Sequence, residues 1–312
     1  MTEDCMEEKI NGRIIKGTGG LYTVLLTDGE NAGDSRISCR ARGALRHRSV
    51  VPLAGDNVLL GTETGADGAL TYVIDGIGER KNSLIRPPLA NLDFLFVTLA
   101  AASPSPVLLT VDKLISICVY NKIEPVIVIT KSELDGQYAG ELAHIYTLAG
   151  FDTFVTSSVS GQGTEELGRF ANELPAGSIS AFAGASGVGK STLMNRLFPA
   201  LSLSTSEISR KTERGRHTTR QTELFGITAG NDPVFVADTP GFTMLDFGQF
   251  DFFGLDDLPH TMRDFSPYIG KCTHTKEEGC AVLEAVRNGE IAPSRHESYL
   301  MMYDVLKAKK KW

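Results

Sequence analysis

The sequence has no long hydrophobic run. Its 312 residues contain no apolar stretch close to the roughly 18 residues that a membrane-spanning helix needs. The first residues, Met1 to Cys5, are acidic and polar rather than signal-like. We therefore expect a cytoplasmic protein. At this length, and with 42% hydrophobic residues, the chain can form two or three domains with cores of their own.

Cysteine is scarce, and the net charge is not positive. Five cysteines, an odd number with no regular spacing apart from Cys272 and Cys280, argue against a disulfide framework. Cys118 lies on the apolar face of an expected helix, where a small buried side chain is the ordinary interpretation. The net charge of -7 by itself argues against a nucleic-acid partner.

Positive charge is nevertheless clustered in two places. One cluster lies within nine residues and the other at the C-terminus; a short basic run is compatible with a solvated face as well as with a binding patch. The residues are Arg40, Arg42, Arg46, His47 and Arg48 in the first cluster, and Lys307, Lys309, Lys310 and Lys311 in the second.

One stretch matches the pattern G-x-x-x-x-G-K-[ST] of a phosphate-binding loop and follows an apolar run, Ile179 to Ala183, that predicts a buried strand. In such a loop the backbone N–H groups surround the β-phosphate, the lysine binds the β- and γ-phosphates, and the serine hydroxyl ligates Mg²⁺. The stretch reads Gly184, Ala185, Ser186, Gly187, Val188, Gly189, Lys190, Ser191, and Thr192 follows it.

Before this loop the pattern changes from short strands to alternating strands and helices. Five short strands punctuated by turns predict a small closed barrel such as an OB-fold, which either binds nucleic acid or braces the next domain. The expected strands are Arg13 to Lys16, Tyr22 to Leu26, Arg36 to Arg42, Asn57 to Gly61 and Leu70 to Ile77. The proline-containing stretch Arg80 to Asp93 predicts a boundary, and the apolar run Phe94 to Ala101, a helical repeat and the run Val126 to Ile129 then predict a β-α-β unit.

Polar residues follow several of the expected strands, where an open parallel sheet binds ligands. Thr130, Lys131 and Glu133 resemble the [NT]-K-x-D element of GTPases, with Lys131 along the base and Glu133 as the reader of guanine. Glutamate in place of aspartate moves the carboxylate by about 1 Å, a shift that can matter in a tight site. Ser157 and Ser158 follow the next expected strand and are expected to close over the oxygen of the base.

Asp238-Thr239-Pro240-Gly241 ends another apolar strand, 48 positions after Lys190. This position predicts a Walker-B aspartate on Mg²⁺ and a Gly241 N–H that meets the γ-phosphate. Both base-reading elements precede the phosphate loop, the reverse of the usual GTPase order, so we expect a circular permutation. A C-terminal domain would then follow the segment that senses the γ-phosphate, and hydrolysis could reposition it.

The chain resembles the ribosome small-subunit-dependent GTPase A (RsgA) family. The resemblance covers residues 12 to about 300 and rests on matching stretches at 40–43, 55–58, 80–84, 86–93, 184–192, 215–219, 238–242, 272–274 and 279–282. It implies an α/β protein in three domains: an OB-fold RNA-binding domain over 1–82, a circularly permuted P-loop GTPase domain with a doubly wound sheet over 83–245, and a mainly helical C-terminal zinc-type domain over 246–312.

The resemblance also implies a function. The implied partners are GTP and GDP and the 30S ribosomal subunit with its 16S rRNA. The subunit would stimulate GTP hydrolysis during its late maturation, and the protein would be a monomer that binds no membrane. Thr219 would be the switch threonine on Mg²⁺ with Ser191 and Asp238, Thr218 being the alternative. Phe242 occupies the place of the water-orienting glutamine, so His217 becomes the catalytic candidate, although an exposed or RNA-contacting histidine is the other interpretation.

Two further implications concern RNA and zinc. The basic cluster at Arg40, Arg42, Arg46 and Arg48 becomes an expected rRNA contact. Cys272, His274 and Cys280 supply three ligands of a Cys₃His zinc site, but Pro267 stands where the family has its first cysteine. Either another residue or water completes the tetrahedron, or zinc has been lost. The remaining alternatives are a non-ribosomal GTP-binding switch and an RNA-binding module with a degenerate nucleotide site.

Overall fold

The structure is a computed structural model of the chain, and it describes residues 9–28, 33, 35–43, 45, 51–64, 70–85, 87–198, 222–228, 233–238 and 253–309. The chain divides into two compact units. The first unit comprises Met1–Asp93, Asn172–Ala181 and Glu213–Pro240, and the second comprises Phe94–Ala171, Phe182–Thr212 and Gly241–Trp312.

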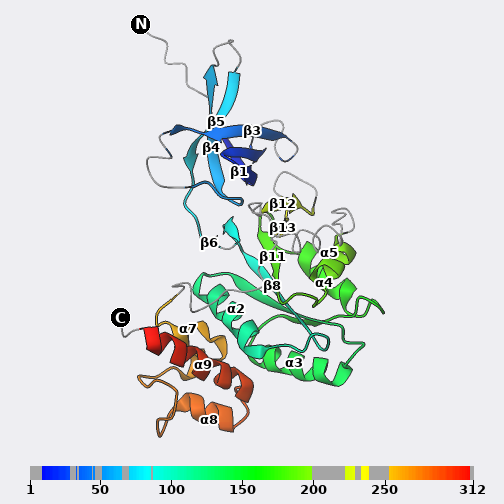
Figure 1. The fold of residues 1–312 in the computed structure, drawn as a ribbon, viewed down its shortest axis with the longest axis vertical. Coiled ribbons are helices and arrows are strands. Elements are labelled where there is room, and N and C mark those ends of the chain that lie inside the picture. Colours follow the sequence, from blue (N-terminus) through cyan, green and yellow to red (C-terminus); the bar gives the residue numbers. More distant parts are fainter. Residues whose placement is uncertain are drawn as a thin grey trace. The chain divides into compact units, whose positions relative to one another are not determined.

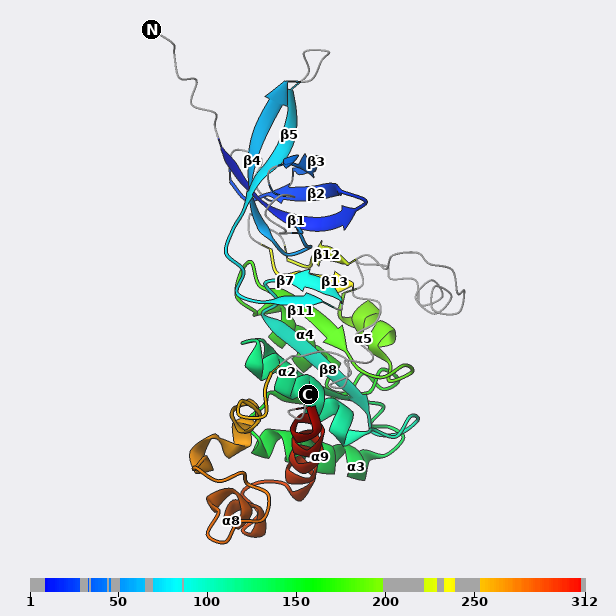
Figure 2. The same cartoon turned by 60° about the vertical axis from the view of Figure 1, so that its left-hand side comes forward.

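The first unit contains a closed five-stranded barrel, drawn in blue to cyan in Figures 1 and 2. Its strands are β1 (Ile10–Thr18), β2 (Leu21–Leu26), β3 (Arg36–Ala41), β4 (Asn57–Thr64) and β5 (Leu70–Ile77). They follow one another in the order β1-β2-β3-β5-β4, and the antiparallel pairing of β1 with β4 closes the ring. All five strands expected from the sequence are present. The barrel is filled by alternating apolar side chains, among them Ile14, Val24, Leu60 and Ile74.

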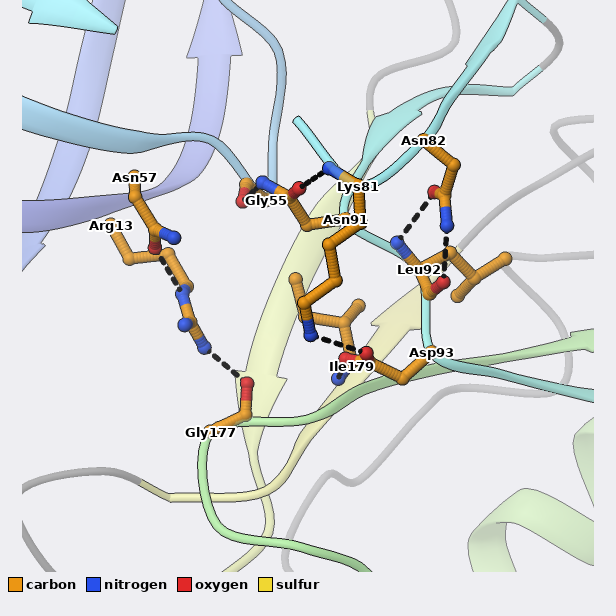
Figure 3. A network of polar contacts seen from close by, with 10 residues as sticks. All are labelled: Arg13, Gly55, Asn57, Lys81, Asn82, Asn91, Leu92, Asp93, Gly177 and Ile179. Carbon is orange, nitrogen blue, oxygen red and sulfur yellow. Dashed lines mark hydrogen bonds and ion pairs between the residues drawn. The ribbon is translucent and has the colours of Figure 1, made fainter. Parts of the chain in front are cut away.

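The stretch expected to be a boundary, Arg80 to Asp93, contains a short hairpin, β6 (Ser83–Ile85) and β7 (Pro88–Ala90). Side chains around the hairpin fasten its ends together (Figure 3). Asn82 donates to Leu92 O at 2.8 Å and accepts from Leu92 N at 3.0 Å. Asn91, at φ 57°, accepts from Lys81 N and donates to Gly55 O, a carbonyl of the barrel.

Asp93 extends this set to the strand that precedes the phosphate loop. Its side chain accepts from Ile179 N at 2.9 Å and pairs with Lys81 Nζ at 2.7 Å (Figure 3). Arg13 of the barrel donates to Gly177 O at 2.5 Å. We call Lys81, Asn82, Asn91 and Asp93 the linker clamp, because they join the barrel, the hairpin and the start of the next strand within the first unit.

The strand β11 (Ile179–Ala183) belongs partly to each unit. In the first unit it pairs in parallel with β13 (Phe235–Asp238), and β13 pairs antiparallel with β12 (Glu223–Gly226), which reaches β1 through Lys16 and Glu223. In the second unit its last residues adjoin β8 (Phe94–Ala100), and Phe182 stacks on Phe96 with ring centroids 4.7 Å apart.

The second unit has the expected β-α-β pattern. β8, β9 (Glu124–Thr130) and β10 (Thr153–Val155) are parallel, and three helices connect them and continue the chain. These helices are α2 (Leu108–Tyr120), α3 (Gly136–Leu148) and α4 (Thr164–Asn172). Nearly every residue of β8 and β9 is buried, as expected for strands covered on both faces. Cys118 is buried on α2, as its position predicted.

The C-terminal part of the second unit is mainly helical. It consists of α7 (Leu258–Thr261), the 3₁₀ helix η2 (Arg263–Tyr268), α8 (Ala281–Arg287) and α9 (Pro293–Lys309). Figure 1 shows α9, in red, beside α2. Tyr299, Met302 and Leu306 form the buried face of α9, and they share one apolar cluster with Ile117 of α2. In the described part of the chain, no helix has the length and apolar character needed to cross a membrane.

Candidate functional site

The phosphate-binding loop runs from the end of β11 to the start of α5 (Lys190–Leu197). Gly184 has a φ of 147°, and a Cβ there would lie 2.0 Å from Thr98 O on the neighbouring strand. Gly189 has a φ of 99° at the N-cap of α5. Only glycine satisfies both conditions, the close approach at the first position and the left-handed backbone at the second. The spacing of the motif is thus explained by the turn that it forms.

Lys190 lies over this loop. Its Nζ donates to Gly184 O and to Ala185 O, each at 2.8 Å, and burial lowers the pKa of Lys190 to about 8. An ammonium held by weak carbonyl acceptors at the beginning of a helix has the position and charge to bind phosphate oxygens. Ser191 is partly exposed and Thr192 is exposed on the first turn of α5, where backbone N–H groups have no intrahelical acceptor.

Thr130 joins the base-reading element to the phosphate loop. It is the last residue of β9, is 2% exposed, and donates its hydroxyl to Val188 O at 2.6 Å. Leu99 O lies further from the same hydroxyl, at 3.2 Å. Because a hydroxyl has only one proton to donate, we assign the hydrogen bond to the shorter contact, that with Val188 O. The [NT]-K-x-D element and the phosphate loop are therefore in direct contact through a buried polar side chain.

Lys131 and Glu133 follow immediately. Lys131 has a φ of 56°, and its Nζ donates to Ser103 O in the loop after β8. Glu133 is exposed in the turn that follows. The N–H of Ser132 donates to Thr156 O at 3.3 Å, so this turn adjoins the end of β10.

Ser157 and Ser158 begin a compact loop that ends at Gly163. Ser157 is fully buried; its Oγ accepts from Ser160 N at 3.1 Å and its carbonyl accepts from Gly161 N at 2.9 Å. The N–H of Ser157 donates to Gln162 O at 3.0 Å. Ser158 is partly exposed. The loop thus holds its own shape and adjoins the Thr130–Glu133 element.

Several expected site residues lie outside the described residues: His217, Thr219, Gly241, Arg46 and Arg48. Asp238 is described as the last residue of β13, without its side chain. Their roles stay predictions. The structure brings together the phosphate loop, Thr130 and Lys131, and it places Ser157 and Ser158 on the neighbouring loop.

On the barrel, Arg40 is exposed on β3 and shares its face with Arg36, a residue that the basic cluster in the sequence did not include. Alternation along the strand was the signal that could have identified Arg36. Arg42 is already paired: its Nε lies 2.6 Å from Asp75 Oδ1 and 3.4 Å from Glu63 Oε1. Its positive charge is partly neutralised before any partner arrives.

The three expected metal ligands converge in the C-terminal region. Their ligand atoms all lie within 4.8 Å of one another, and His274 Nδ1 is 3.3 Å from both Cys272 Sγ and Cys280 Sγ. Tetrahedral zinc with bonds of about 2.0–2.3 Å separates its donors by about 3.5 Å, so the three side chains fit the ion. Pro267 lies in η2 and offers no donor, so it leaves the fourth position to another ligand.

The loop between these ligands is shaped by Glu277. Its carboxylate accepts from Thr273 N at 2.7 Å and from Thr275 N at 2.9 Å, and hydrogen bonding, from the Thr273 hydroxyl above all, lowers the pKa of Glu277 to about 2. Helix α9 supports the same loop: Tyr299 OH donates to Thr273 O, and His296 Nε2 lies 2.8 Å from His274 O. The three donors are therefore held in place by contacts other than a metal ion.

Comparison with known proteins gives a consistent result. The family model described as RsgA N-terminal domain matches residues 11–70, and the one described as RsgA GTPase matches residues 77–248. Two curated relatives are named small ribosomal subunit biogenesis GTPase RsgA. The one from Geobacillus kaustophilus is 38% identical over 309 residues, covering 96% of this chain and 98% of its own. The one from Geobacillus thermodenitrificans is 39% identical over 312 residues, with the same coverage.

Two solved structures are also similar over nearly the whole chain. YjeQ from Thermotoga maritima has a TM-score of 0.76 and 31% identity, covering 96% of this chain and 99% of its own. YloQ, described as a circularly permuted GTPase, has a TM-score of 0.74 and 30% identity, with all of both chains covered. The permuted order of the nucleotide-binding elements and the barrel that precedes them thus have counterparts in solved structures.

Proposed function

Because the chain belongs to the RsgA family of GTPases, we propose that it binds GTP at the loop around Lys190, hydrolyses it to GDP and phosphate, and acts in late maturation of the small (30S) ribosomal subunit. The observation that carries this proposal is the buried hydrogen bond from Thr130 to Val188 O. It joins a base-reading element to a phosphate-binding loop that comes later in the chain, as a permuted GTPase requires.

In this proposal different residues of the nucleotide site bind the phosphates, the base and the Mg²⁺ ion. Lys190 and the N–H groups of residues 184–192 bind the phosphates, Lys131 lies along the base, Glu133 accepts from the N1–H and 2-amino groups, and Ser157 and Ser158 close over the base oxygen. Mg²⁺ would be held by Ser191, Thr219 and Asp238, and it would neutralise negative charge on the phosphates. Gly241 senses the γ-phosphate, and His217 orients the attacking water.

The proposed functional domains are a barrel over 1–82 that contacts 16S rRNA through Arg40, Arg42, Arg46 and Arg48, a GTPase domain over 83–245, and a C-terminal domain over 246–312. We propose that Cys272, His274 and Cys280 of this last domain bind one zinc ion, which supplies a structural cross-link. In this proposal the protein is a monomeric, cytoplasmic GTPase, and the 30S subunit is the partner that activates it.

The test is GTP turnover by the purified chain with and without purified 30S subunits. A GTPase that awaits its activator turns over at about 10⁻⁴ to 10⁻³ s⁻¹, and a full activator raises this by up to about 10⁵-fold. We expect slow turnover alone and a large stimulation by 30S subunits, with 50S subunits as the matched control. Turnover without any 30S stimulation would indicate a non-ribosomal switch, and no turnover at all would indicate an RNA-binding module with a degenerate site.

Guanine selection is tested in the same preparation by competing ATP against GTP. A site that pairs a buried carboxylate with the guanine edge can discriminate by about 10⁴-fold or more. We expect GTP to be retained in a large excess of ATP. Displacement of GTP by ATP at comparable concentration would contradict the assignment of the Thr130–Glu133 element.

A further inference from the structure

The loop Ser157–Gly163 has two adjacent backbone N–H groups that find no acceptor among the described residues. The N–H groups of Ser157, Ser160, Gly161, Gln162 and Thr164 all donate within the loop, whereas those of Ser158, Val159 and Gly163 donate to no described residue. Val159 is 80% exposed, so this part of the loop lies at the surface rather than in a core. Two adjacent free donors are suited to a carbonyl oxygen of a ligand.

The direction of these two N–H groups is set by the carbonyls that share their peptide planes. In a trans peptide the C=O and the N–H point in opposite directions. The C=O of Ser157 accepts from Gly161 N at 2.9 Å, which orients the N–H of Ser158. The C=O of Ser158 accepts from Arg196 Nη1 at 2.7 Å, which orients the N–H of Val159.

Arg196 is not part of the loop. It lies on α5, the helix that begins at the phosphate-binding Lys190, and it is 38 residues away from Ser158 in the sequence. Gly161 leaves room for the guanidinium: a Cβ at this position would lie 2.5 Å from Arg196 Nη2, and the φ of Gly161 is 86°. The Ser158 carbonyl and the side of Gly161 that lacks a Cβ thus together accommodate the Arg196 guanidinium.

We propose that Arg196 is a positioning residue for guanine recognition: anchored on the helix of the phosphate-binding loop, it holds the Ser158 carbonyl so that the N–H of Val159, beside that of Ser158, meets the 6-oxo group of the base. This inference rests on the proposed function, since it assigns a role in the same nucleotide site. The Arg196 contact is a second polar connection between the base-reading elements and the phosphate-binding segment, in addition to the hydrogen bond from Thr130 to Val188 O.

The experiment compares nucleotides that each differ from GDP in one edge group. Dissociation constants are measured for GDP, for 6-thioguanosine diphosphate, in which a weakly accepting sulfur replaces the 6-oxo oxygen while N1–H and the 2-amino group stay, and for inosine diphosphate, which lacks the 2-amino group. They are measured in the parent chain and in Arg196→Ala, Arg196→Lys and Arg169→Ala. Arg169 is an exposed arginine on α4 and serves as the matched control.

In the parent, replacing the 6-oxo oxygen with sulfur should weaken binding by about tenfold, the value of one or two hydrogen bonds. In Arg196→Ala we expect this ratio to shrink by about fivefold, because the N–H of Val159 is no longer held in place. The ratio of inosine diphosphate to GDP should stay at the parent value, since Glu133 reads the 2-amino group. Arg196→Lys should recover part of the ratio, and Arg169→Ala should equal the parent.

The proposal is overturned if the 6-oxo ratio is the same in Arg196→Ala and the parent, or if that variant weakens all three nucleotides equally. A parent chain that does not prefer GDP to ADP would instead contradict the proposed guanine site itself. Thermal unfolding of each variant, which we expect to match the parent because Arg196 is exposed, separates a local effect from loss of the fold.

Discussion

Lys190 shows how one residue acquires its chemistry from its surroundings. Burial lowers its pKa to about 8, from an ordinary value of 10.5, so the unliganded site loses the positive charge in mildly alkaline solution. Bound phosphates would favour the charged amine and raise that pKa again. Nucleotide binding above pH 8 therefore takes up a proton. The stability of the nucleotide-free chain, by contrast, rises with pH between about 8 and 10.5, because the unfolded chain binds this proton more tightly than the folded chain does.

The affinity for GDP should consequently fall as the pH rises. Above the pKa of the free amine, the decrease approaches about tenfold per pH unit. Titration calorimetry between pH 7 and pH 9, in two buffers with different ionisation enthalpies, measures both the affinity and the proton uptake. Lys190→Ala is the control, since it carries only the pH dependence of the nucleotide and of the other groups. An equal pH dependence in the parent and in the variant would contradict the assignment.

At the level of elements, the linker clamp makes a stability prediction. Asn91 is 7% exposed, holds a φ of 57°, and makes hydrogen bonds with Lys81 N and Gly55 O. Asn91→Gly keeps the backbone conformation accessible and removes both bonds, so it should lower the free energy of unfolding by about 2 kcal/mol. Asn91→Ala should cost about 1 kcal/mol more, because alanine is strained at positive φ.

Urea denaturation followed by circular dichroism measures both variants. Asn288→Ala is the control. This exposed asparagine follows α8, and its replacement should change the free energy of unfolding by no more than about 0.5 kcal/mol. If Asn91→Gly is as stable as the parent, the clamp does not hold the hairpin.

The zinc proposal is also a prediction about elements. The purified chain should contain one zinc per molecule by atomic absorption, and Cys272→Ala should reduce this content, since two ligands cannot hold the ion tightly. Treatment with a zinc chelator should make the loop around Lys276 more sensitive to trypsin, because a bound ion would tie Cys272, His274 and Cys280 together across that loop. A magnesium chelator should leave the cleavage pattern unchanged. A zinc-free parent that resists trypsin equally well would contradict the proposal.

The sequence predicts an element well when the residues that determine it are close together in the chain. Glycine spacing, strand alternation and helical repeats are local, so the barrel strands, the phosphate loop and the β-α-β unit could all be predicted. The hairpin β6–β7 was not, because Pro87 and Pro88 obscure its short alternation. Asn91 and Arg196 act through partners 36 and 38 residues away, and no local pattern marks such contacts.

At the scale of the molecule, a buried ion cluster ties the C-terminal region to the GTPase elements of the second unit. Arg295 of α9 is fully buried and pairs with Asp112 of α2 at 2.5 Å and with Asp264 of η2 at 2.9 Å. Burial raises the pKa of Asp112 even though Arg295 opposes the shift. A nucleotide-dependent movement of the C-terminal region must either break these pairs or move α2 with it.

Arg295→Ala would leave two buried carboxylates without their partner. We expect a loss of about 3–5 kcal/mol in the free energy of unfolding at pH 7. The loss should shrink as the pH falls toward 5, because the unpaired carboxylates bind protons more tightly in the folded chain than in the unfolded one. Urea denaturation at both pH values measures this, with the exposed Arg287→Ala as control. A loss that does not depend on pH would show that packing, rather than charge, is what Arg295 contributes.

The two hydrogen bonds between Asp93 and Ile179 also provide a spectroscopic reporter. The N–H of Ile179 donates to the Asp93 carboxylate at 2.9 Å, and the N–H of Asp93 donates to Ile179 O at 2.8 Å (Figure 3). The Ile179 amide hydrogen is therefore shielded by a side chain of the linker rather than by a neighbouring strand. Its exchange with deuterium would report, five residues before the loop that begins at Gly184, whether the hydrogen bonds to Asp93 are formed.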